Sequence, residues 1–298
     1  TFASHFLSPS VRWFFRKRME RAVRHLNTRL ERPIEPFKLA RRVDTIQRLI
    51  YDSDVVVAVN EQAKAEKIPE GVAFERARRF AREIVPSFSA TAYFGFAIRA
   101  ARWLSQGLYD VRLEDKKLDR SVLGSPDTAV VYVMNHRSNM DYVLVTYLAA
   151  SQSALSYAVG EWARIWPLAP LIRAMGAYFI RRRERTALYR RVLARYVQMA
   201  TMGRVTQAIF PEGGLSLTGG LTKPKLGLLS YITSLEAADA PDILFIPVSI
   251  NYDRVLEDEV LVKAHRSGQR KFGVRLPVVV LRVMRNLALK LIGRFKRY

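Results

Sequence analysis

The sequence predicts an α/β protein with a largely parallel central sheet flanked by helices, preceded by an N-terminal helical region. From about residue 110, short β-rich runs alternate with helical stretches, which is typical of a layered fold with a parallel sheet. The first hundred residues show helical periodicity without such runs. Hydrophobic residues make up 49% of the 298 residues, so the chain can bury a sizeable core.

Five runs are the predicted strands, namely 129–134, 155–159, 177–180, 206–210 and 243–250. Helix-like segments lie between them, among them 184–202 and 226–237. Upstream, the periodicity predicts helices over 11–29, from about 37 towards 59, and over 71–85. The apolar segment 86–108 contains only two charged residues, and we expect it to be buried rather than to lie in an interface.

These elements divide the chain into three parts: a helical, basic N-terminal region (1–108), an α/β domain (109–262) and a basic amphipathic C-terminal segment (263–298). The net charge of +22 is concentrated in the outer parts. Residues 1–48 hold 12 basic and 4 acidic side chains, and residues 260–298 hold 11 and none. Such ends favour an anionic polymer or surface, so nucleic acid and the anionic cytoplasmic leaflet are the two candidate partners.

The basic ends also carry apolar side chains, which favours a membrane surface over nucleic acid. Segment 11–29 mixes Trp13, Phe14 and Phe15 with seven basic residues, although a solvated helix packed on the rest of the protein is an equal alternative. We expect peripheral or monotopic binding through 11–29 and 277–298, because no uninterrupted apolar window reaches the ~20 residues of a spanning helix. No signal peptide is visible, and the chain begins at Thr1, as a trimmed piece of a longer protein would.

Several kinds of site are excluded by composition. The chain has no cysteine, which rules out disulfides, thiolate metal sites and a cysteine nucleophile. Only four histidines are present, so we do not expect a multi-histidine metal site. We also expect no cofactor.

The first group of residues with catalytic potential follows the strand 129–134. His136 is placed at the strand end and Asp141 in the first turn of the next helix, where the carboxylate can meet one imidazole nitrogen. A histidine held by a carboxylate is a general base for a hydroxyl nucleophile. Ser138-x-x-Asp141 is also a capping-box pattern, and the two roles can coexist.

Two further strand ends carry polar residues. Arg181 and Arg182 follow the strand 177–180, and paired guanidinium groups suit an anion such as phosphate. Glu212, Gly213 and Gly214 follow the strand 206–210. The glutamate can accept substrate hydroxyl groups or order a neighbour, and the glycines let backbone N–H groups approach an oxyanion or phosphate.

These blocks, together with the proline-containing strand 243–250, resemble the glycerolipid acyltransferase superfamily, with its His-x4-Asp box, and most closely its bacterial glycerol-3-phosphate acyltransferase branch. The similarity covers roughly residues 86–260. It implies transfer of a fatty acyl group from acyl-CoA or acyl carrier protein, as co-substrate, to the 1-hydroxyl of glycerol-3-phosphate, the first step of phospholipid synthesis. His136 and Asp141 would be catalytic, and these residues would bind substrate: Arg137, Ser138, Arg181, Arg182, Glu212, Gly213, Gly214, Ser216 and Lys225.

One departure from the family pattern concerns the acceptor. The family usually places arginine after Glu-Gly-Gly, and this chain has Leu215. Lys223 or Lys225 could replace that cation, or Arg181 and Arg182 could suffice. Acyl transfer to 1-acylglycerol-3-phosphate or dihydroxyacetone phosphate is therefore the alternative, and a basic nucleic-acid-binding protein is the alternative of another class.

Overall fold

The computed structural model describes residues 9–113, 125, 127–149, 153–160, 163–164, 168–181, 184, 186–236, 238–268 and 285. The predicted phosphate ligand Arg182 lies outside these residues, as does the segment 277–298 apart from Arg285.

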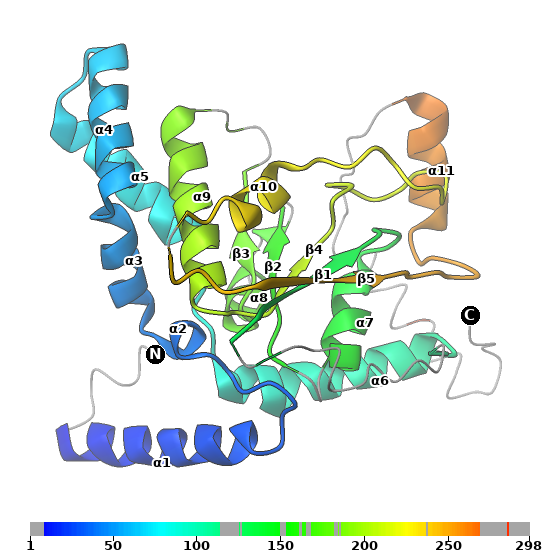
Figure 1. Ribbon diagram of the computed structural model, residues 1–298. Helices are drawn as coiled ribbons and strands as arrows, with labels where there is room; N and C mark the ends of the chain where they lie inside the picture. The colour runs from blue at the N-terminus through cyan, green and yellow to red at the C-terminus, as the bar shows by residue number, and fades with distance from the viewer. Residues whose placement is uncertain are drawn as a thin grey trace.

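A five-stranded parallel sheet forms the centre of the molecule (Figure 1). Its strands are β1 (Ala129–Met134), β2 (Ser156–Val159), β3 (Tyr178–Phe179), β4 (Gln207–Ile209) and β5 (Ile243–Val248), in the order β3-β2-β4-β1-β5. Every pairing is parallel, which confirms the predicted fold class. Each strand falls within its predicted run.

Both faces of the sheet are buried, as a parallel sheet requires. Along β1, Val131 and Val133 contact the cluster on one face, whereas Val130, Tyr132 and Met134 belong to the cluster on the other. The continuous apolar run in the sequence reflects this two-sided burial.

One face of the sheet is covered by α9 (Ala187–Met202) and α10 (Gly227–Thr233), together with the N-terminal helices α3 (Arg42–Ile50), α4 (Ser53–Glu66) and α5 (Glu70–Ile84). The N-terminal region therefore shares a core with the α/β domain. The helical stretch predicted from 37 towards 59 is interrupted: α2 (Pro36–Leu39), α3 and α4 are separate. Asp52 ends the run because it is the N-cap of α4, accepting a hydrogen bond from Asp54 N at 3.1 Å.

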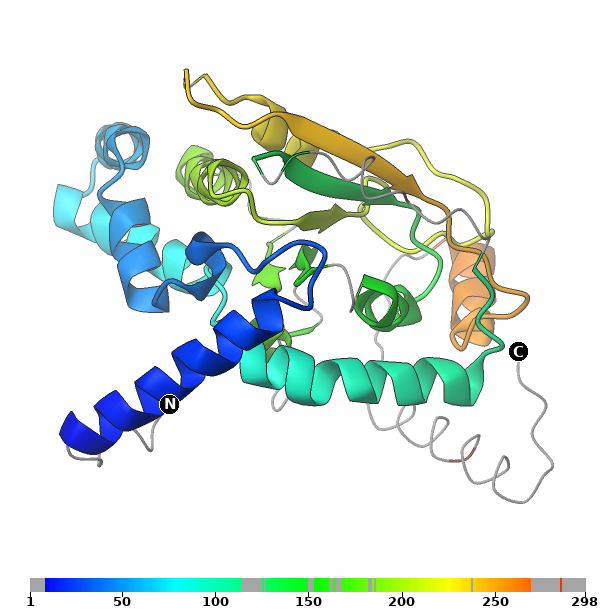
Figure 2. The ribbon, with the colours of Figure 1, turned by 60° about the horizontal axis from the view of Figure 1, so that its bottom comes forward.

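The other face is covered by α7 (Met140–Leu148) and α8 (Leu168–Ala174), and α6 (Ile98–Leu108) lies against α7. A π-helical segment, η2 (Thr91–Ala97), precedes α6. The last turns of α1 (Pro9–Asn27) pack beside the buried Tyr93 of η2. Figures 1 and 2 show α1 and α6 on the same side of the molecule, and α11 (Asp258–Ser267) beyond the end of β5.

The expectation that 86–108 is buried is wrong for two of its aromatic residues. Ala97, Ala101 and Leu108 are buried, but Phe96 and Trp103 are 61% and 59% exposed. Helical geometry explains the difference, because η2 and α6 bury one face and present the other to the surroundings. Among the described helices, none combines the length and the apolar character needed to cross a membrane.

The connections of the sheet place a topological switch point between β1 and β4. The chain leaves β1 into α7 on one face, and it leaves the adjacent β4 into α10 on the opposite face. Such a switch point, outside the carboxyl ends of parallel strands, is where open α/β sheets bind ligands. His136 and Glu212 lie at the two strand ends that flank it.

Candidate active site

His136 and Asp141 meet as the sequence predicts. Imidazole Nδ1 lies 2.8 Å from Asp141 Oδ2, in a site where His136 is only 3% exposed. Nδ1 donates to the carboxylate, and no hydrogen bond from the described residues reaches Nε2. This nitrogen is therefore the one that can take a proton from a hydroxyl group.

Asp141 also binds the turn that precedes α7, and Ser138 Oγ accepts a hydrogen bond from Met140 N at 3.0 Å, so the catalytic geometry and the capping pattern coexist. Asp141 Oδ2 accepts hydrogen bonds from the backbone N–H groups of Arg137 (2.7 Å) and Ser138 (3.1 Å). The hydrogen bonds from the short turn between β1 and α7 thus hold the Asp141 carboxylate against the His136 imidazole.

The turn after β4 holds His136 from the other side. Glu212 Oε1 accepts the His136 backbone N–H at 3.0 Å, and the Ser216 N–H donates to the His136 carbonyl oxygen at 2.9 Å. Glu212 Oε2 accepts from Thr222 N (3.2 Å) and Oγ1 (2.9 Å). Of the two roles predicted for Glu212, the structure displays the ordering of a neighbour.

Gly213 and Lys225 form the outer part of this turn. Gly213 has φ of +64°, a conformation that favours glycine. A Cβ placed on it would lie 3.3 Å from Lys225 Nζ, so the exposed ammonium group crosses the turn. The structure therefore brings Lys225 to the strand end where Leu215 replaces the usual arginine. The N–H groups of Gly214 and Leu215 make no hydrogen bond within the described residues.

Arg137 is half-buried and reaches the loop that follows β5. Its Nη2 lies 3.3 Å from Asn251 Oδ1, and its Nη1 lies 2.9 Å from where a Cβ would stand on Gly219. Arg137 and Ser216 line a pocket of about 560 Å³ beside the His-x4-Asp box, residues 136–141. The Arg137 guanidinium is thus a cation next to His136, within the box itself.

Arg181 lies apart from this group. Its Nε and Nη2 donate to Glu83 Oε2 and Oε1 at 2.7 and 2.6 Å, and Arg164 pairs with the same carboxylate at 3.1 Å. Burial alone would raise the pKa of Glu83, but the hydrogen bonds from Arg181 and Arg164 outweigh it and lower this pKa. Two strands separate β3 from β1, or roughly 14 Å across the sheet.

Sequence reasoning gave no role to two residues that the structure brings to the box. The Tyr252 hydroxyl donates to Asp141 Oδ1 at 2.7 Å. Glu257 accepts from Ser138 Oγ (2.7 Å) and from Asn139 N (3.1 Å). A prediction that the strand 243–250 pairs with the strand 129–134 could have placed these two residues at the box. The residues that follow neighbouring parallel strands lie at the same edge of the sheet.

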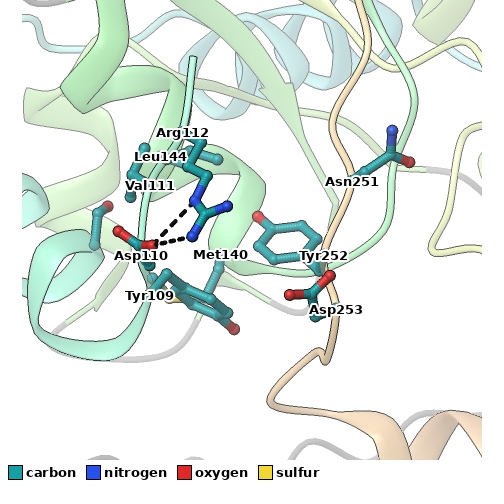
Figure 3. A pocket seen from close by; sticks show the side chains of 10 residues that line it. Tyr109, Asp110, Val111, Arg112, Met140, Leu144, Asn251, Tyr252 and Asp253 are labelled. Atoms are coloured by element: carbon teal, nitrogen blue, oxygen red, sulfur yellow. Dashed lines mark hydrogen bonds and ion pairs between the residues drawn. The ribbon is translucent and has the colours of Figure 1, made fainter. Parts of the chain in front are cut away.

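A second pocket, of about 390 Å³, is also lined by Tyr252 (Figure 3). Its walls include Tyr109, Met140 and Leu144, and Asp110 pairs with Arg112 beside it. In the described part of the chain, no three His, Asp or Glu side chains are grouped closely enough to hold a metal ion.

Comparisons with known proteins show what the chain is similar to. Residues 112–251 match the family model described as Acyltransferase. This segment of the chain is therefore similar to that family. Proteins named glycerol-3-phosphate acyltransferase from Haemophilus ducreyi and Actinobacillus pleuropneumoniae are each 31% identical over 261 residues, and one from Pasteurella multocida is 30% identical over 260. These alignments cover 84% of this chain and 31% of each relative, so the chain spans about a third of their length.

The matched segment contains His136, Asp141 and the turn after β4, whereas Tyr252 and Glu257 lie beyond its end. The resemblance inferred from the sequence motifs is confirmed. A solved structure, the 1-acyl-sn-glycerophosphate acyltransferase from Thermotoga maritima, aligns with 19% identity and a TM-score of 0.34, over 61% of this chain and 80% of that one.

Proposed function

We propose that this protein transfers a fatty acyl group from acyl-CoA or acyl carrier protein to the 1-hydroxyl of glycerol-3-phosphate. The observation that carries the proposal is the buried His136–Asp141 pair at the switch point of the sheet. The names of the relatives support this choice of acceptor.

In the proposed reaction, His136 Nε2 removes the hydroxyl proton as the oxygen attacks the thioester carbonyl carbon. A C–O bond forms, and the tetrahedral intermediate then collapses with cleavage of the C–S bond. The imidazolium returns its proton to the departing thiolate. Asp141 keeps Nδ1 protonated and stabilises the imidazolium.

The oxyanion needs hydrogen-bond donors that the fold has not already used. Every backbone N–H from 136 to 141 is paired, with Glu212, Asp141, Glu257 or Ser138. Among the backbone N–H groups left without a hydrogen bond in the adjacent turn are those of Gly214 and Leu215, and we assign the oxyanion to these two. A leucine at 215 is compatible with this role because the backbone supplies the donor.

We assign the acceptor phosphate to Arg137 and Lys225, which lie at the box and at the turn beside it. Arg181 was predicted for this role, and it can reach a phosphate only by releasing Glu83. We therefore expect Arg137 and Lys225 to contribute more to acceptor binding than Arg181. Charge-assisted contacts of this kind are worth about 1.5–3 kcal/mol each.

The acceptor test uses purified protein in detergent, a labelled acyl-CoA or acyl carrier protein, and a panel of phosphorylated acceptors. We expect the highest kcat/KM with glycerol-3-phosphate. A higher value with 1-acylglycerol-3-phosphate or dihydroxyacetone phosphate would replace the proposed acceptor, and no transfer to any acceptor would contradict the proposed function.

We further propose that the protein docks peripherally on the cytoplasmic face of the cell membrane. Trp13 on α1 is 60% exposed and Trp103 on α6 is 59% exposed. Figures 1 and 2 show these two helices on the same side of the molecule. Lys17 lies over the Trp13 ring, with Nζ 4.6 Å from the ring centroid, and Arg102 is exposed near Trp103 in the sequence. Exposed aromatic rings among basic side chains suit an anionic lipid surface.

Liposome co-sedimentation at varied anionic lipid content and salt tests the docking. Trp13→Ala and Trp103→Ala should weaken binding that persists in high salt, whereas Lys17→Gln should weaken binding at low salt. Binding indifferent to lipid charge and to all three substitutions would contradict a docking face on α1 and α6. Tight duplex DNA binding under the same salt would instead favour the nucleic-acid alternative.

A further inference from the structure

The carboxylate of Asp141 is held on both oxygens, by different parts of the chain. Oδ2 accepts from His136 Nδ1 and from two backbone N–H groups, as described above. Among the described residues, only Tyr252 bonds Oδ1, through its hydroxyl at 2.7 Å. The contacts at Oδ2 hold only one of the two carboxylate oxygens. The Tyr252 hydroxyl holds the other, and it therefore fixes the rotation of the carboxyl group.

Tyr252 is itself held firmly. The side chain of Asn135 accepts a hydrogen bond from Ile250 N at 2.7 Å and donates one to Ile250 O at 2.8 Å. This link ties the chain after β5 to the chain after β1, directly before the box. The Tyr252 ring also packs edge-on against Tyr109, with centroids 5.2 Å apart, on the pocket wall seen in Figure 3.

The hydroxyl stays a hydrogen-bond donor over the working pH range. Burial, and next the charge of Asp141, raise the pKa of Tyr252 above its ordinary value. A neutral phenol donating to a buried carboxylate neither competes for the proton on His136 nor leaves Oδ1 without a partner.

We propose that Tyr252 is a positioning residue for acyl transfer, whose hydroxyl orients Asp141 so that the carboxylate keeps His136 in its reactive geometry. The inference rests on the proposed function and adds a residue that acts through Asp141. Misplacement of a catalytic group by about 1 Å can cost roughly 100-fold in rate. The loss should therefore appear in kcat and not in KM.

The test compares Tyr252→Phe with wild type in the labelled acyl-transfer assay. We expect kcat to fall roughly 10-fold to 100-fold, with both KM values unchanged. Tyr147→Phe is the matched control, because it also deletes a phenol hydroxyl, one bonded to Gln106 at 3.1 Å and remote from Asp141 along α7. The control should keep the wild-type kcat.

Two additional measurements separate positioning from a structural role. In an Asp141→Asn background, Tyr252→Phe should cause no further loss of kcat, because both changes break one chain of contacts. Tyr252→Gln, which retains a donor, should keep more activity than Tyr252→Leu, although both remove the ring.

Provided that the wild-type protein transfers acyl groups, the inference is overturned if Tyr252→Phe leaves kcat unchanged or raises KM alone. It is also overturned if the losses from Tyr252→Phe and Asp141→Asn multiply, or if the Gln and Leu variants of Tyr252 have equal kcat. A wild-type protein that transfers no acyl group to any acceptor would instead overturn the proposed function, and the inference with it.

Discussion

Replacing Glu83 with glutamine should loosen the attachment of the N-terminal helices to the edge of the sheet. Glu83 lies at the end of α5 and holds Arg181 after β3 by two hydrogen bonds, with Arg164 as a third contact. The carboxylate is 15% exposed and both arginines are about 30% exposed, so the cluster is neither fully buried nor fully solvated.

These exposures set the size of the effect. Exposed pairs contribute about 0–1 kcal/mol, and removal of one partner from a buried pair costs about 3–5 kcal/mol. We therefore expect Glu83→Gln to lower the free energy of unfolding by about 2 kcal/mol, or Tm by roughly 4–8 °C.

The pH dependence follows from the lowered pKa of Glu83, which is caused by the two arginines against the opposing effect of burial. A carboxyl group whose pKa is lower in the folded state stabilises the fold fully above its usual value near 4.5. That contribution is lost as the pH falls through the lower folded pKa. The difference between wild type and Glu83→Gln should be constant near neutral pH and should shrink in acid.

Urea unfolding at pH 7 and at a series of acidic pH values measures this difference. Glu66→Gln is the control, because Glu66 pairs with Arg76 on the exposed surface of the same helical region. It should change the free energy of unfolding by less than about 1 kcal/mol. Equal stability of Glu83→Gln and Glu66→Gln would refute the assigned strength of the Glu83 cluster.

Other substitutions test the phosphate ligands and the two turns around the box. In acceptor kinetics, Lys225→Ala and Arg137→Ala should each raise the KM for glycerol-3-phosphate roughly ten- to hundred-fold, with a smaller rise for Arg181→Ala; a larger effect of Arg181 would reverse the assignment. Gly213→Ala should cost about 1 kcal/mol or more in urea unfolding, because its φ is +64° and the new Cβ meets the Lys225 side chain; unchanged stability would show that the turn adapts. Glu257→Gln should lower kcat with little change in KM, because a weaker acceptor holds the box; an unchanged kcat would make Glu257 dispensable.

Much of the fold could be predicted from local patterns. The alternation of short β-rich runs with helices predicts the parallel sheet, and the apolar run 129–134 coincides with β1. The contact between His136 and Asp141 was predictable because it spans only five residues and depends on one strand-to-helix turn.

Contacts between distant segments were not predictable in this way. Tyr252 and Asp141 are 111 residues apart, and Arg181 and Glu83 are 98 apart, so no local pattern connects them. Arg181 was predicted to face a phosphate because it forms a pair with Arg182 at the end of a strand. Its observed partner is a carboxylate supplied by another region of the chain. The exposure of Trp103 was missed because apolar composition alone does not tell which face of a helix is covered.

The assigned base and its carboxylate are tested most directly by His136→Ala and Asp141→Asn in the labelled acyl-transfer assay, with circular dichroism to check the fold. We expect both variants to stay folded and to lose ~10²–10⁴-fold in kcat, since each removes part of a positioned general base. Near-full turnover in Asp141→Asn would show that the carboxylate only caps α7, and near-full turnover in His136→Ala would contradict general-base catalysis by this histidine.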